Sequence, residues 1–375
     1  MYKMMTPGPT QVRENVRMAR SLEFQNPDLD ADFCEYYKET CLLASELLHT
    51  KNETLILDGE GILGLEAACA SITEPGDRVL VIDNGLYGES FKDFVTMYGG
   101  IPTLYTVDYD KPVDPEKLAE YLKEQHDFKY ATVVHCDTPS GMLNDISKIC
   151  PLLKSYGILT VVDSVSAMFG EEVRADDYRI DLLCGGSQKA ISAPPGLTIV
   201  TISQDAKDVM NQRKTPIASF YANLKVFEHY YEEKWFPYTM PASDIYGLRQ
   251  ALENIKNDPE HLKRHAKVAE KTRTTLKEMG LTLYPHSGYS NTVTTFEVPE
   301  GFTDKEILSK MRNDYNILLA GSFGCFGGKL IRIGHMGESA NEKDVDEVLQ
   351  ALKKSWENKI TWINFHLLRY LSESQ

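Results

Sequence analysis

The sequence has no cluster of basic residues and little positive charge overall. Its 375 residues include 55 Asp and Glu against 40 Lys and Arg, a formal net charge of -15 at pH 7, and the Lys and Arg residues are scattered along the chain. Binding to a phosphate backbone or to an anionic membrane surface needs gathered cations. We therefore predict that this protein has neither a nucleic-acid partner nor a membrane partner.

Long apolar runs are also lacking. Residues 1–10 contain no apolar core of an export signal. The apolar tract at 360–371 is interrupted by Asn364, His366 and Arg369 and is shorter than the roughly 20 residues that cross a bilayer. We expect a cytoplasmic protein.

Paired cysteine motifs are absent as well. None of the seven cysteines, at positions 34, 41, 69, 136, 150, 184 and 325, belongs to a Cys-x-x-Cys pair. This spacing suggests neither a zinc knuckle nor a disulfide framework, and we predict no metal site. A chain of this length, with 42% hydrophobic and 25% charged residues, buries a large core. We expect one globular unit with two packed subdomains.

From residue 54 onwards, short β-branched runs alternate with helical stretches. This alternation is typical of a mainly parallel sheet that helices cover on both faces. Seven strands are predicted, at 54–58, 77–83, 103–109, 130–137, 158–165, 180–186 and 197–203. The predicted fold class is therefore α/β, with a large domain built on a seven-stranded, mainly parallel sheet.

The pattern changes at 241–279, where two long charged stretches are typical of helices. The elements predicted after them are two strands and two helices, at 291–298, 303–314, 329–337 and 341–357. They form a smaller C-terminal α+β domain. We place the boundary near Pro259, which divides the chain into a large domain at 1–258, including the N-terminal segment, and a small domain at 259–375.

Ligands of an open parallel sheet bind outside the carboxyl ends of its strands. The polar residues that follow predicted strands, and so should share this edge, are Glu60, Asp83, Tyr87, Asp137, Thr138, Asp163 and Lys189. Burial among small residues would lower the pKa of Lys189 and leave a neutral amine that attacks a carbonyl. Asp163 ends an apolar strand, where a carboxylate would keep a pyridine nitrogen protonated. Taken singly, Asp163 would more often cap a helix and Lys189 would be a solvated charge, but their combination indicates pyridoxal chemistry.

Longer motifs carry a family resemblance. The chain resembles the class V aminotransferases of the fold-type I pyridoxal phosphate enzymes, in particular the alanine–glyoxylate and serine–pyruvate group, over nearly all of its length except the C-terminal end. The matching segments are TPGPT (6–10), GLEAA (64–68), PGDRVLV (75–81), NGLYG (84–88), DTPSG (137–141), VVDSVSAMFG (161–170), GGSQKAISAPPGL (185–197) and LIRIGHMG (330–337). The resemblance implies an aminotransferase that uses pyridoxal 5'-phosphate.

The same resemblance implies roles for the residues that hold this cofactor. Lys189 matches the Schiff-base lysine, which also carries the proton between the substrate Cα and the cofactor. Asp163 matches the partner of the pyridinium nitrogen, and Tyr87 takes the place of the aromatic residue that stacks on the ring. Thr138 would bind near the phenolic oxygen of the ring, although an ordinary turn threonine would look the same. Gln188 would line the phosphate side.

Substrate and subunit contacts follow from the resemblance too. Arg332 matches the arginine whose planar fork grips the substrate carboxylate, and Glu60 and Pro9 would lie beside the substrate. Thr239, in FPYTMP, matches a threonine that reaches the phosphate site of the neighbouring subunit. The implied partners are a small amino acid, a 2-oxo acid and a second copy of the chain in a homodimer with a shared active site.

The loop Gly59-Glu60-Gly61 departs from the family pattern. Backbone N-H groups at a helix N-terminus usually cup a phosphate, and Glu60, Gly61 and Ile62 occupy that position here. A carboxylate and a phosphate dianion repel each other in a partly buried site. Phe236 also stands where many relatives have a phosphate-binding tyrosine. We therefore expect a neutral hydroxymethyl group in the cup, with unphosphorylated pyridoxal or pyridoxamine bound there as a substrate.

Within the family these features look most similar to the pyridoxamine–pyruvate transaminases, which convert pyridoxamine and pyruvate into pyridoxal and alanine. The alternative is an alanine–glyoxylate or serine–pyruvate type enzyme that holds pyridoxal phosphate while Glu60 turns to solvent, since the helix dipole alone favours an acid in the first turn. The segment at 24–30 differs from the His-Arg of many such relatives. A lyase or desulfurase on the same scaffold is a further alternative, with Cys325 as the nucleophile.

Overall fold

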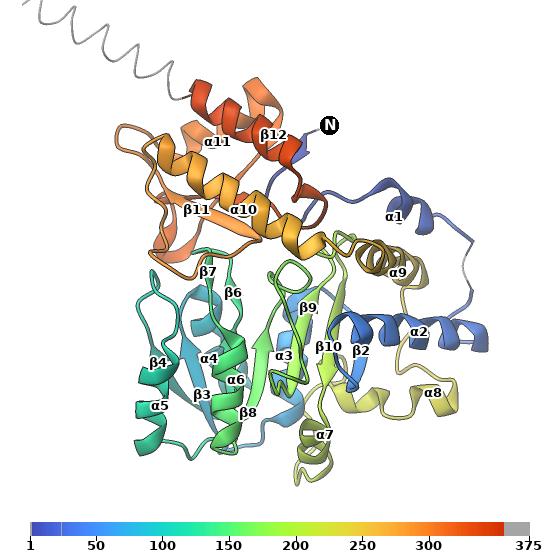
Figure 1. Cartoon of the computed structure of the whole chain (residues 1–375). Coiled ribbons are helices and arrows are strands. Elements are labelled where there is room, and N and C mark those ends of the chain that lie inside the picture. The colour runs from blue at the N-terminus through green and yellow to red at the C-terminus, as the bar shows by residue number, and fades with distance from the viewer. Residues whose placement is uncertain (1, 24, 356–375) are drawn as a thin grey trace, which may run out of the picture.

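The large unit of the molecule is built on a seven-stranded sheet (Figure 1). The computed structural model describes residues 2–23 and 25–355. In spatial order the strands are β2 (Glu53–Asp58), β10 (Leu197–Ile202), β9 (Leu182–Gly186), β8 (Leu159–Asp163), β5 (Tyr130–Val134), β3 (Arg78–Asp83) and β4 (Ile101–Thr106). Neighbouring strands are parallel except at β10, which is antiparallel to both β2 and β9. The predicted seven-stranded, mainly parallel sheet is confirmed.

Burial explains why the apolar runs form the interior strands. Every residue of β5, β8, β9 and β10 is buried, as expected of strands that are covered on both faces. β4, at the edge of the sheet, is only partly buried, and it ends at Thr106 rather than at 109. The strand predicted at 130–137 is interrupted at His135, and its last residues form β6 (Cys136–Asp137), which pairs with β7 (Met142–Leu143).

Helices cover the sheet. α3 (Gly61–Ile72) packs on β8, β9 and β10, and α4 (Leu86–Met97) packs on β3, β4 and β5. α2 (Ala31–Leu47) packs on β2, and α9 (Ala242–Lys256) packs on both α1 (Glu14–Ala19) and α2. The other helices of this unit are α5 (Pro115–Glu124), α6 (Ile146–Ser155), α7 (Gln204–Asn211), the 3-10 helix η1 (Leu224–Phe227) and α8 (Tyr230–Glu233).

The smaller unit, at the top of Figure 1, has an antiparallel sheet of its own. In spatial order its strands are β11 (Val293–Glu297), β14 (Leu330–Gly334) and β13 (Ala320–Gly321). Its helices include α10 (His261–Glu278), α11 (Asp304–Tyr315) and the 3-10 helices η2 (Gly324–Phe326) and η3 (Gly337–Ser339). Residues 342–355 are helical. Residues 356–357 of the helix predicted at 341–357, and the apolar tract at 360–371, lie outside the described residues.

The N-terminal strand pairs with the C-terminal part of the chain. β1 (Lys3–Met4) is parallel to β12 (Ile317–Leu318), and Met5 belongs to the hydrophobic core of the smaller unit. The other members of that core come from residues 268–352, whereas the core of the large unit comes from residues 16–252. The predicted boundary between 258 and 259 falls between these two cores and stays a prediction.

No helix in residues 2–23 and 25–355 is long and apolar enough to cross a membrane. Over the same residues, His, Cys, Asp and Glu side chains form no group of three or more placed to hold a metal ion. The cytoplasmic location stays a prediction.

Candidate active site

The carboxyl ends of five strands meet at one edge of the large sheet. Because β10 is antiparallel to both of its neighbours, β2 runs in the same direction as β9, β8, β5 and β3. Six polar residues stand at or just after these strand ends and interact with one another through charges or hydrogen bonds. They are Glu60, Tyr87, Asp137, Asp163, Gln188 and Lys189. Arg332, on β14 of the smaller unit, interacts electrostatically with Lys189. The two units therefore share one site.

The N-terminal segment lies against Lys189. The Nζ atom of Lys189 donates to the carbonyl oxygen of Pro7 at 2.7 Å. Thr10 forms two hydrogen bonds with the backbone at Lys189. Its N-H donates to the Gln188 carbonyl at 3.1 Å, and its hydroxyl donates to the Lys189 carbonyl at 3.0 Å. These bonds hold the predicted catalytic lysine beneath a strap that comes from the other unit.

The ammonium form of Lys189 is disfavoured. Burial lowers its pKa below the ordinary value, the positive charge of Arg332 lowers it further, and the negative charge of Asp163 opposes both. A lowered lysine pKa increases the fraction of neutral amine near pH 7. Lys189 therefore has the electrostatic environment of a nucleophile and proton carrier rather than that of a solvated surface charge.

Asp163 is buried, with 5% of its surface exposed. Burial raises the pKa of its carboxyl group to about 7, while the backbone N-H of Val165, which donates to Oδ1 at 2.9 Å, and the charge of Lys189 lower that pKa. A carboxylate in such a place gains from a cationic partner. The protonated nitrogen of a pyridine ring supplies this charge, so that Asp163 fits a vitamin B6 ring.

Glu60 occupies the N-terminus of α3 with its own side chain. Its Oε1 atom accepts the backbone N-H of Ile62 at 3.0 Å, and its Oε2 atom accepts Nε2 of Gln188 at 2.9 Å. Gly61 allows the close approach of this helix end to β8, because a Cβ atom there would lie 2.7 Å from a methyl group of Val165. The backbone N-H that a phosphate would use is therefore already bonded to a carboxylate.

Gln188 is left with one unused acceptor. Its Oε1 atom is buried, and no donor in the described residues reaches it. A buried acceptor without a donor is costly and points to a missing partner. A ligand with a hydrogen-bond donor would satisfy this acceptor, whereas a phosphate dianion has no donor.

Tyr87 is positioned by a carboxylate from a distant part of the chain. Its backbone N-H donates to Oδ1 of Asp137 at 3.0 Å, and Asp137 also accepts the hydroxyl of Ser140 at 2.7 Å. Asp137 is fully buried, and this burial raises its pKa to about 6. Thr138, the next residue, is buried as well. The sequence placed Asp137 at the sheet edge, but its bond to the start of α4 was not predicted.

Arg332 is a buried cation that interacts electrostatically with the carboxylate of Asp137. It is 9% exposed, its Nε donates to the Gly321 carbonyl at 2.9 Å, and its guanidinium carbon lies 5.6 Å from the centre of the Phe323 ring. In the described part of the chain no ion pair involves it. Because a buried charge gains from a counter-ion, Arg332 is a candidate site for a substrate carboxylate.

Two predicted residues lie apart from this cluster in the single chain. The hydroxyl of Thr239 donates to Oδ2 of Asp28 at 2.8 Å, and Thr239 is exposed. The side chain of Pro9 is also exposed, although Gly8 beside it contacts Lys189. Neither residue joins the hydrogen bonds around Lys189, so their predicted roles stay predictions.

Phe236 is part of an aromatic cluster. It is buried, with its ring stacked on Tyr230 at 5.4 Å between ring centres and edge-on to Phe33 and Tyr37 at 5.7 and 4.9 Å. A tyrosine hydroxyl at this position would need a partner inside the cluster. The predicted replacement of a phosphate-binding tyrosine by Phe236 stays a prediction.

The cysteines are reduced, and six of the seven are buried. Only Cys325, in η2, is exposed. Burial raises the pKa of Cys136 to about 12 and raises that of Cys150 well above its ordinary range, which disfavours their thiolates. Cys325 alone therefore remains as a candidate nucleophile.

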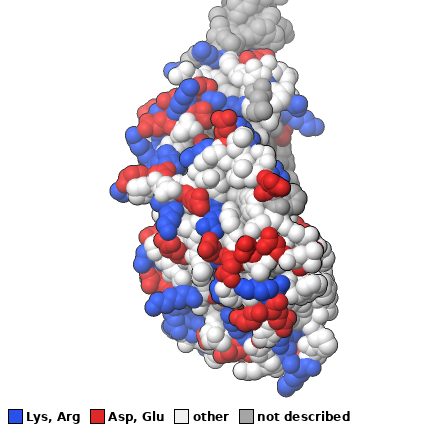
Figure 2. All heavy atoms as spheres, turned by 90° about the vertical axis from the view of Figure 1, so that its right-hand side faces the viewer, with Lys and Arg blue, Asp and Glu red and all other residues white. Residues whose placement is uncertain are grey.

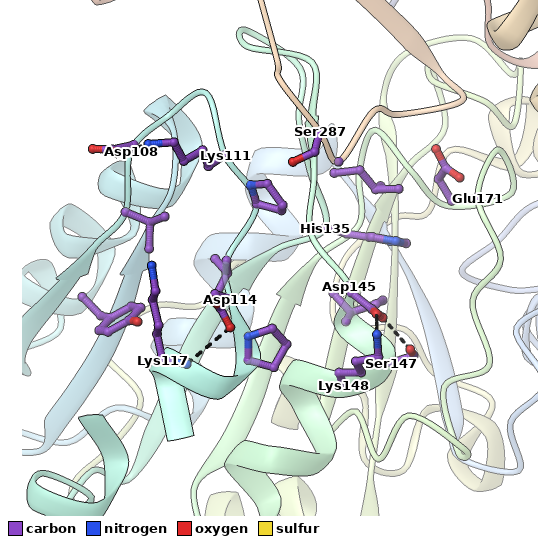
Figure 3. Close-up of a pocket in the computed structure, with 18 of the residues that line it drawn as sticks. Asp108, Lys111, Asp114, Lys117, His135, Asp145, Ser147, Lys148, Glu171 and Ser287 are labelled. Carbon is purple, nitrogen blue, oxygen red and sulfur yellow. Dashed lines mark hydrogen bonds and ion pairs between the residues drawn. The ribbon is translucent and has the colours of Figure 1, made fainter. Parts of the chain in front are cut away.

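A separate cavity of about 930 Å³ opens between the start of α5, the start of α6 and the loop at 287–288 (Figure 3). Some of its charged side chains form ion pairs: Asp145, for example, accepts the Ser147 hydroxyl and forms an ion pair of 3.0 Å with Lys148. The cavity is not lined by Lys189 or Asp163. It is therefore distinct from the site that the sequence predicts.

The chain was compared with known proteins. A family model described as aminotransferase class-V matches residues 17–346. An uncharacterised aminotransferase of Methanocaldococcus jannaschii is 35% identical over 91% of this chain and 89% of its own length. A pyridoxamine–pyruvate transaminase of Mesorhizobium japonicum is 34% identical over 90% of this chain and 86% of its own length. The crystal structure of pyridoxamine–pyruvate aminotransferase from Mesorhizobium loti superimposes with a TM-score of 0.91 at 32% identity, over 95% of this chain and 92% of that one.

Proposed function

The chain belongs to the class-V aminotransferase family and is an aminotransferase with the fold-type I architecture, and from this premise we propose that it transfers an amino group between pyridoxamine and pyruvate, forming pyridoxal and alanine. The observation that supports this substrate pair is the carboxylate of Glu60, which is bonded to both Ile62 and Gln188 at the N-terminus of α3. Unphosphorylated vitamin B6 is then a substrate that enters and leaves, rather than a permanent cofactor.

Electrostatics favours a hydroxymethyl group over a phosphate at Glu60. Two unit charges of like sign about 4 Å apart repel by roughly 4 kcal/mol at the effective dielectric constant of a protein surface. A neutral hydroxyl instead donates a hydrogen bond to the carboxylate, and the negative charge of the acceptor strengthens this bond. Glu60 therefore selects against the phosphate ester by repulsion and for the alcohol by a charge-assisted bond.

Four residues would hold the vitamin B6 ring and act on it. Lys189 would bind its carbonyl carbon, Asp163 its ring nitrogen, and Thr138 the vicinity of its phenolic oxygen, while Tyr87 would stack on its face. The bound ring supplies an electron sink at the substrate Cα. Lys189, which has a lowered pKa, would carry the proton between the nitrogen-bearing carbon of the vitamin and the substrate Cα, toward the Cα when alanine is formed.

Arg332 would orient the substrate. Its guanidinium binds the carboxylate of alanine or pyruvate bidentately, which fixes the Cα next to the amine of Lys189. The hydrogen bond from Nε to the Gly321 carbonyl holds the side chain in place and leaves the terminal nitrogens for the ligand. Pro9, on the strap that covers Lys189, would close the substrate side.

We further propose a homodimer with a shared active site. Large apolar side chains are exposed over α1, α2 and the segment after α8: Met18, Leu22, Leu29, Leu42 and Trp235. Figure 2, which shows this side of the molecule, has wide areas without charged residues between its charged clusters. Exposed apolar side chains in weakly charged surface areas favour protein contacts. Thr239 is exposed and would reach the second subunit's site from here. Sedimentation velocity is expected to give a dimer mass.

An alternative function follows from the exposure of Glu60. Because this side chain is exposed, it can rotate to solvent and free the Ile62 N-H for a phosphate. The enzyme would then retain pyridoxal phosphate and resemble the alanine–glyoxylate or serine–pyruvate aminotransferases. A desulfurase would instead depend on Cys325, and alkylation of this exposed thiol would abolish its activity but spare an aminotransferase.

A direct experiment separates these functions. The purified protein is denatured and the released small molecules are identified by mass spectrometry, while the native protein is titrated with pyridoxal and with pyridoxal phosphate and followed by its absorption spectrum. We expect little bound phosphate ester and a Lys189-dependent spectral change that saturates at lower pyridoxal than pyridoxal phosphate. Stoichiometric pyridoxal phosphate in the released fraction would overturn the proposal in favour of the phosphate-dependent enzyme.

A further inference from the structure

The loop at 321–324 bridges the two units of the molecule beside the site. The hydroxyl of Ser322 donates to the Pro139 carbonyl at 2.8 Å, which ties this loop of the smaller unit to the DTPSG loop of the large one. Gly324 has a φ of +58° and lies so close to Leu86 that a Cβ atom there would be 2.9 Å from a Leu86 methyl group. The loop is thus held at one end by the DTPSG loop and at the other by the start of α4.

This attachment places Phe323 between two residues with proposed roles. Its ring centre lies 6.1 Å from that of Tyr87, with the planes at 75°, and 5.6 Å from the guanidinium carbon of Arg332. Edge-on aromatic contact and a cation over a ring face both stabilise such an arrangement. Phe323 nevertheless keeps 45% of its surface exposed. The ring therefore has a free side next to the proposed carboxylate position.

The surroundings of Phe323 offer little to a charged or long side chain. Apart from Arg332, the charged groups that act on Tyr87 are carboxylates, and one of them, Asp137, also acts on Arg332. A ligand whose first carboxylate occupies Arg332 would meet the apolar ring with the rest of its chain. A small alkyl group packs well against this apolar ring, whereas a second carboxylate would lose its hydration without gaining a partner.

We propose that Phe323 is a specificity-determining residue that limits the amino acid and 2-oxo acid held by Arg332 to short, uncharged side chains such as the methyl group of alanine and pyruvate. This inference rests on the proposed function, because it takes Arg332 as the carboxylate site. It assigns to Phe323 the exclusion of longer chains, and to the bond between Ser322 and Pro139 the positioning of the ring.

The test is the Phe323→Ala variant of the full-length enzyme, with Phe323→Leu as an intermediate. Dissociation constants of pyruvate, 2-oxobutyrate and 2-oxopentanoate are measured by calorimetry, and kcat/KM is measured for alanine, 2-aminobutyrate and norvaline. We expect the preference for the shortest compound to fall about tenfold in Phe323→Ala, since one methylene group in an apolar pocket changes selectivity by roughly that factor or more. Phe323→Leu should lie between the two.

Tyr2→Ala is the matched control, because Tyr2 is another exposed aromatic residue of the smaller unit with an arginine, Arg312, over its ring. It should leave the chain-length preference unchanged, and thermal unfolding checks that both variants are folded. An unchanged preference in Phe323→Ala, with alanine still transferred by the wild type, would overturn the role of Phe323 alone. Failure of the wild type to bind pyruvate or transfer the amino group of alanine would instead overturn the proposed function.

Discussion

The N-termini of α3 and α4 make a direct comparison, because the same backbone position binds a carboxylate in both. The N-H of Ile62 in α3 and the N-H of Tyr87 in α4 each donate to a carboxylate oxygen at 3.0 Å. In α3 the acceptor is Glu60, the exposed N-cap residue two positions before Ile62, whereas in α4 it is Asp137, which is 50 residues away and fully buried.

The comparison shows that identical local bonds serve different purposes. A helix end capped by a buried acid is closed to ligands, and it holds the side chain of Tyr87 in place. A helix end capped by an exposed acid is still open to a ligand, but only to one that tolerates the negative charge. The four predictions below use this contrast, in order of decreasing expected effect.

The largest effect concerns pH and the buried cap. Below about pH 4 the Asp137 carboxyl is protonated in both the folded and the unfolded chain; between its ordinary pKa near 3.9 and about 6 only the folded chain keeps the proton. The folded form therefore binds more protons in this window, so stability falls as the pH rises. Asp137→Asn should remove this fall, which amounts to roughly 3 kcal/mol. The measurement is urea unfolding of wild type and variant at several pH values. Parallel pH profiles would contradict the prediction.

The second effect concerns truncation of each cap. Asp137→Ala leaves the Tyr87 N-H and the Ser140 hydroxyl without their buried acceptor, so that we expect the free energy of unfolding to fall by about 2 kcal/mol and kcat to fall with it. Glu60→Ala removes only an exposed cap and should cost about 1 kcal/mol. Chemical denaturation gives both values. Equal costs would mean that burial does not distinguish the two helix ends.

The third effect concerns the ligand that the N-terminus of α3 accepts with and without the charge of Glu60. Glu60→Ser removes the charge but keeps a capping hydroxyl, so we expect the affinity for pyridoxal phosphate to rise about tenfold, or 1.4 kcal/mol, and the affinity for pyridoxal to fall. Glu116→Ser is the control, because Glu116 is an exposed acid in the first turn of α5. Spectral titration measures both ligands. No gain for the phosphate ester would count against the role assigned to Glu60.

The smallest effect concerns the bond between Gln188 and Glu60. Gln188→Ala removes the donor that orients this carboxylate, and we expect a loss of about 1 kcal/mol in pyridoxal binding. A double-mutant cycle with Glu60→Ala separates this coupling from the effect of each residue alone. Simple additivity of the two changes would show that Gln188 acts independently of Glu60.

Patterns along the chain were enough to predict the sheet and to place polar residues at its edge. The seven apolar runs form short strands, and four of them, β5, β8, β9 and β10, are buried throughout, whereas the edge strand β4 is only partly buried. Lys189 and Asp163 could be selected because they follow two such runs, and the electrostatic interaction between them agrees with that selection. The strand ends were less predictable, as at His135, where β5 stops and β6 begins.

Contacts between distant residues could not be read in the same way. The two-residue strand β1 has no periodicity, and it exists because β12, more than 300 residues later, gives it a hydrogen-bonding partner. Phe323 in a glycine-rich loop carries no signal of its position between Tyr87 and Arg332. The hydrogen-bond partners of Glu60 could not be predicted either, since an acid before a helix can face solvent or a ligand.

The order of apolar runs and turns in the sequence thus determined the α/β fold and which residues stand at the ends of strands, because backbone hydrogen bonding and burial act on short segments. Tertiary structure decided what those residues touch: that Glu60 is bound to Gln188, that Asp137 caps α4, and that Pro7 lies over Lys189. Such contacts depend on how whole elements pack, since packing brings together groups that the chain itself keeps tens to hundreds of residues apart.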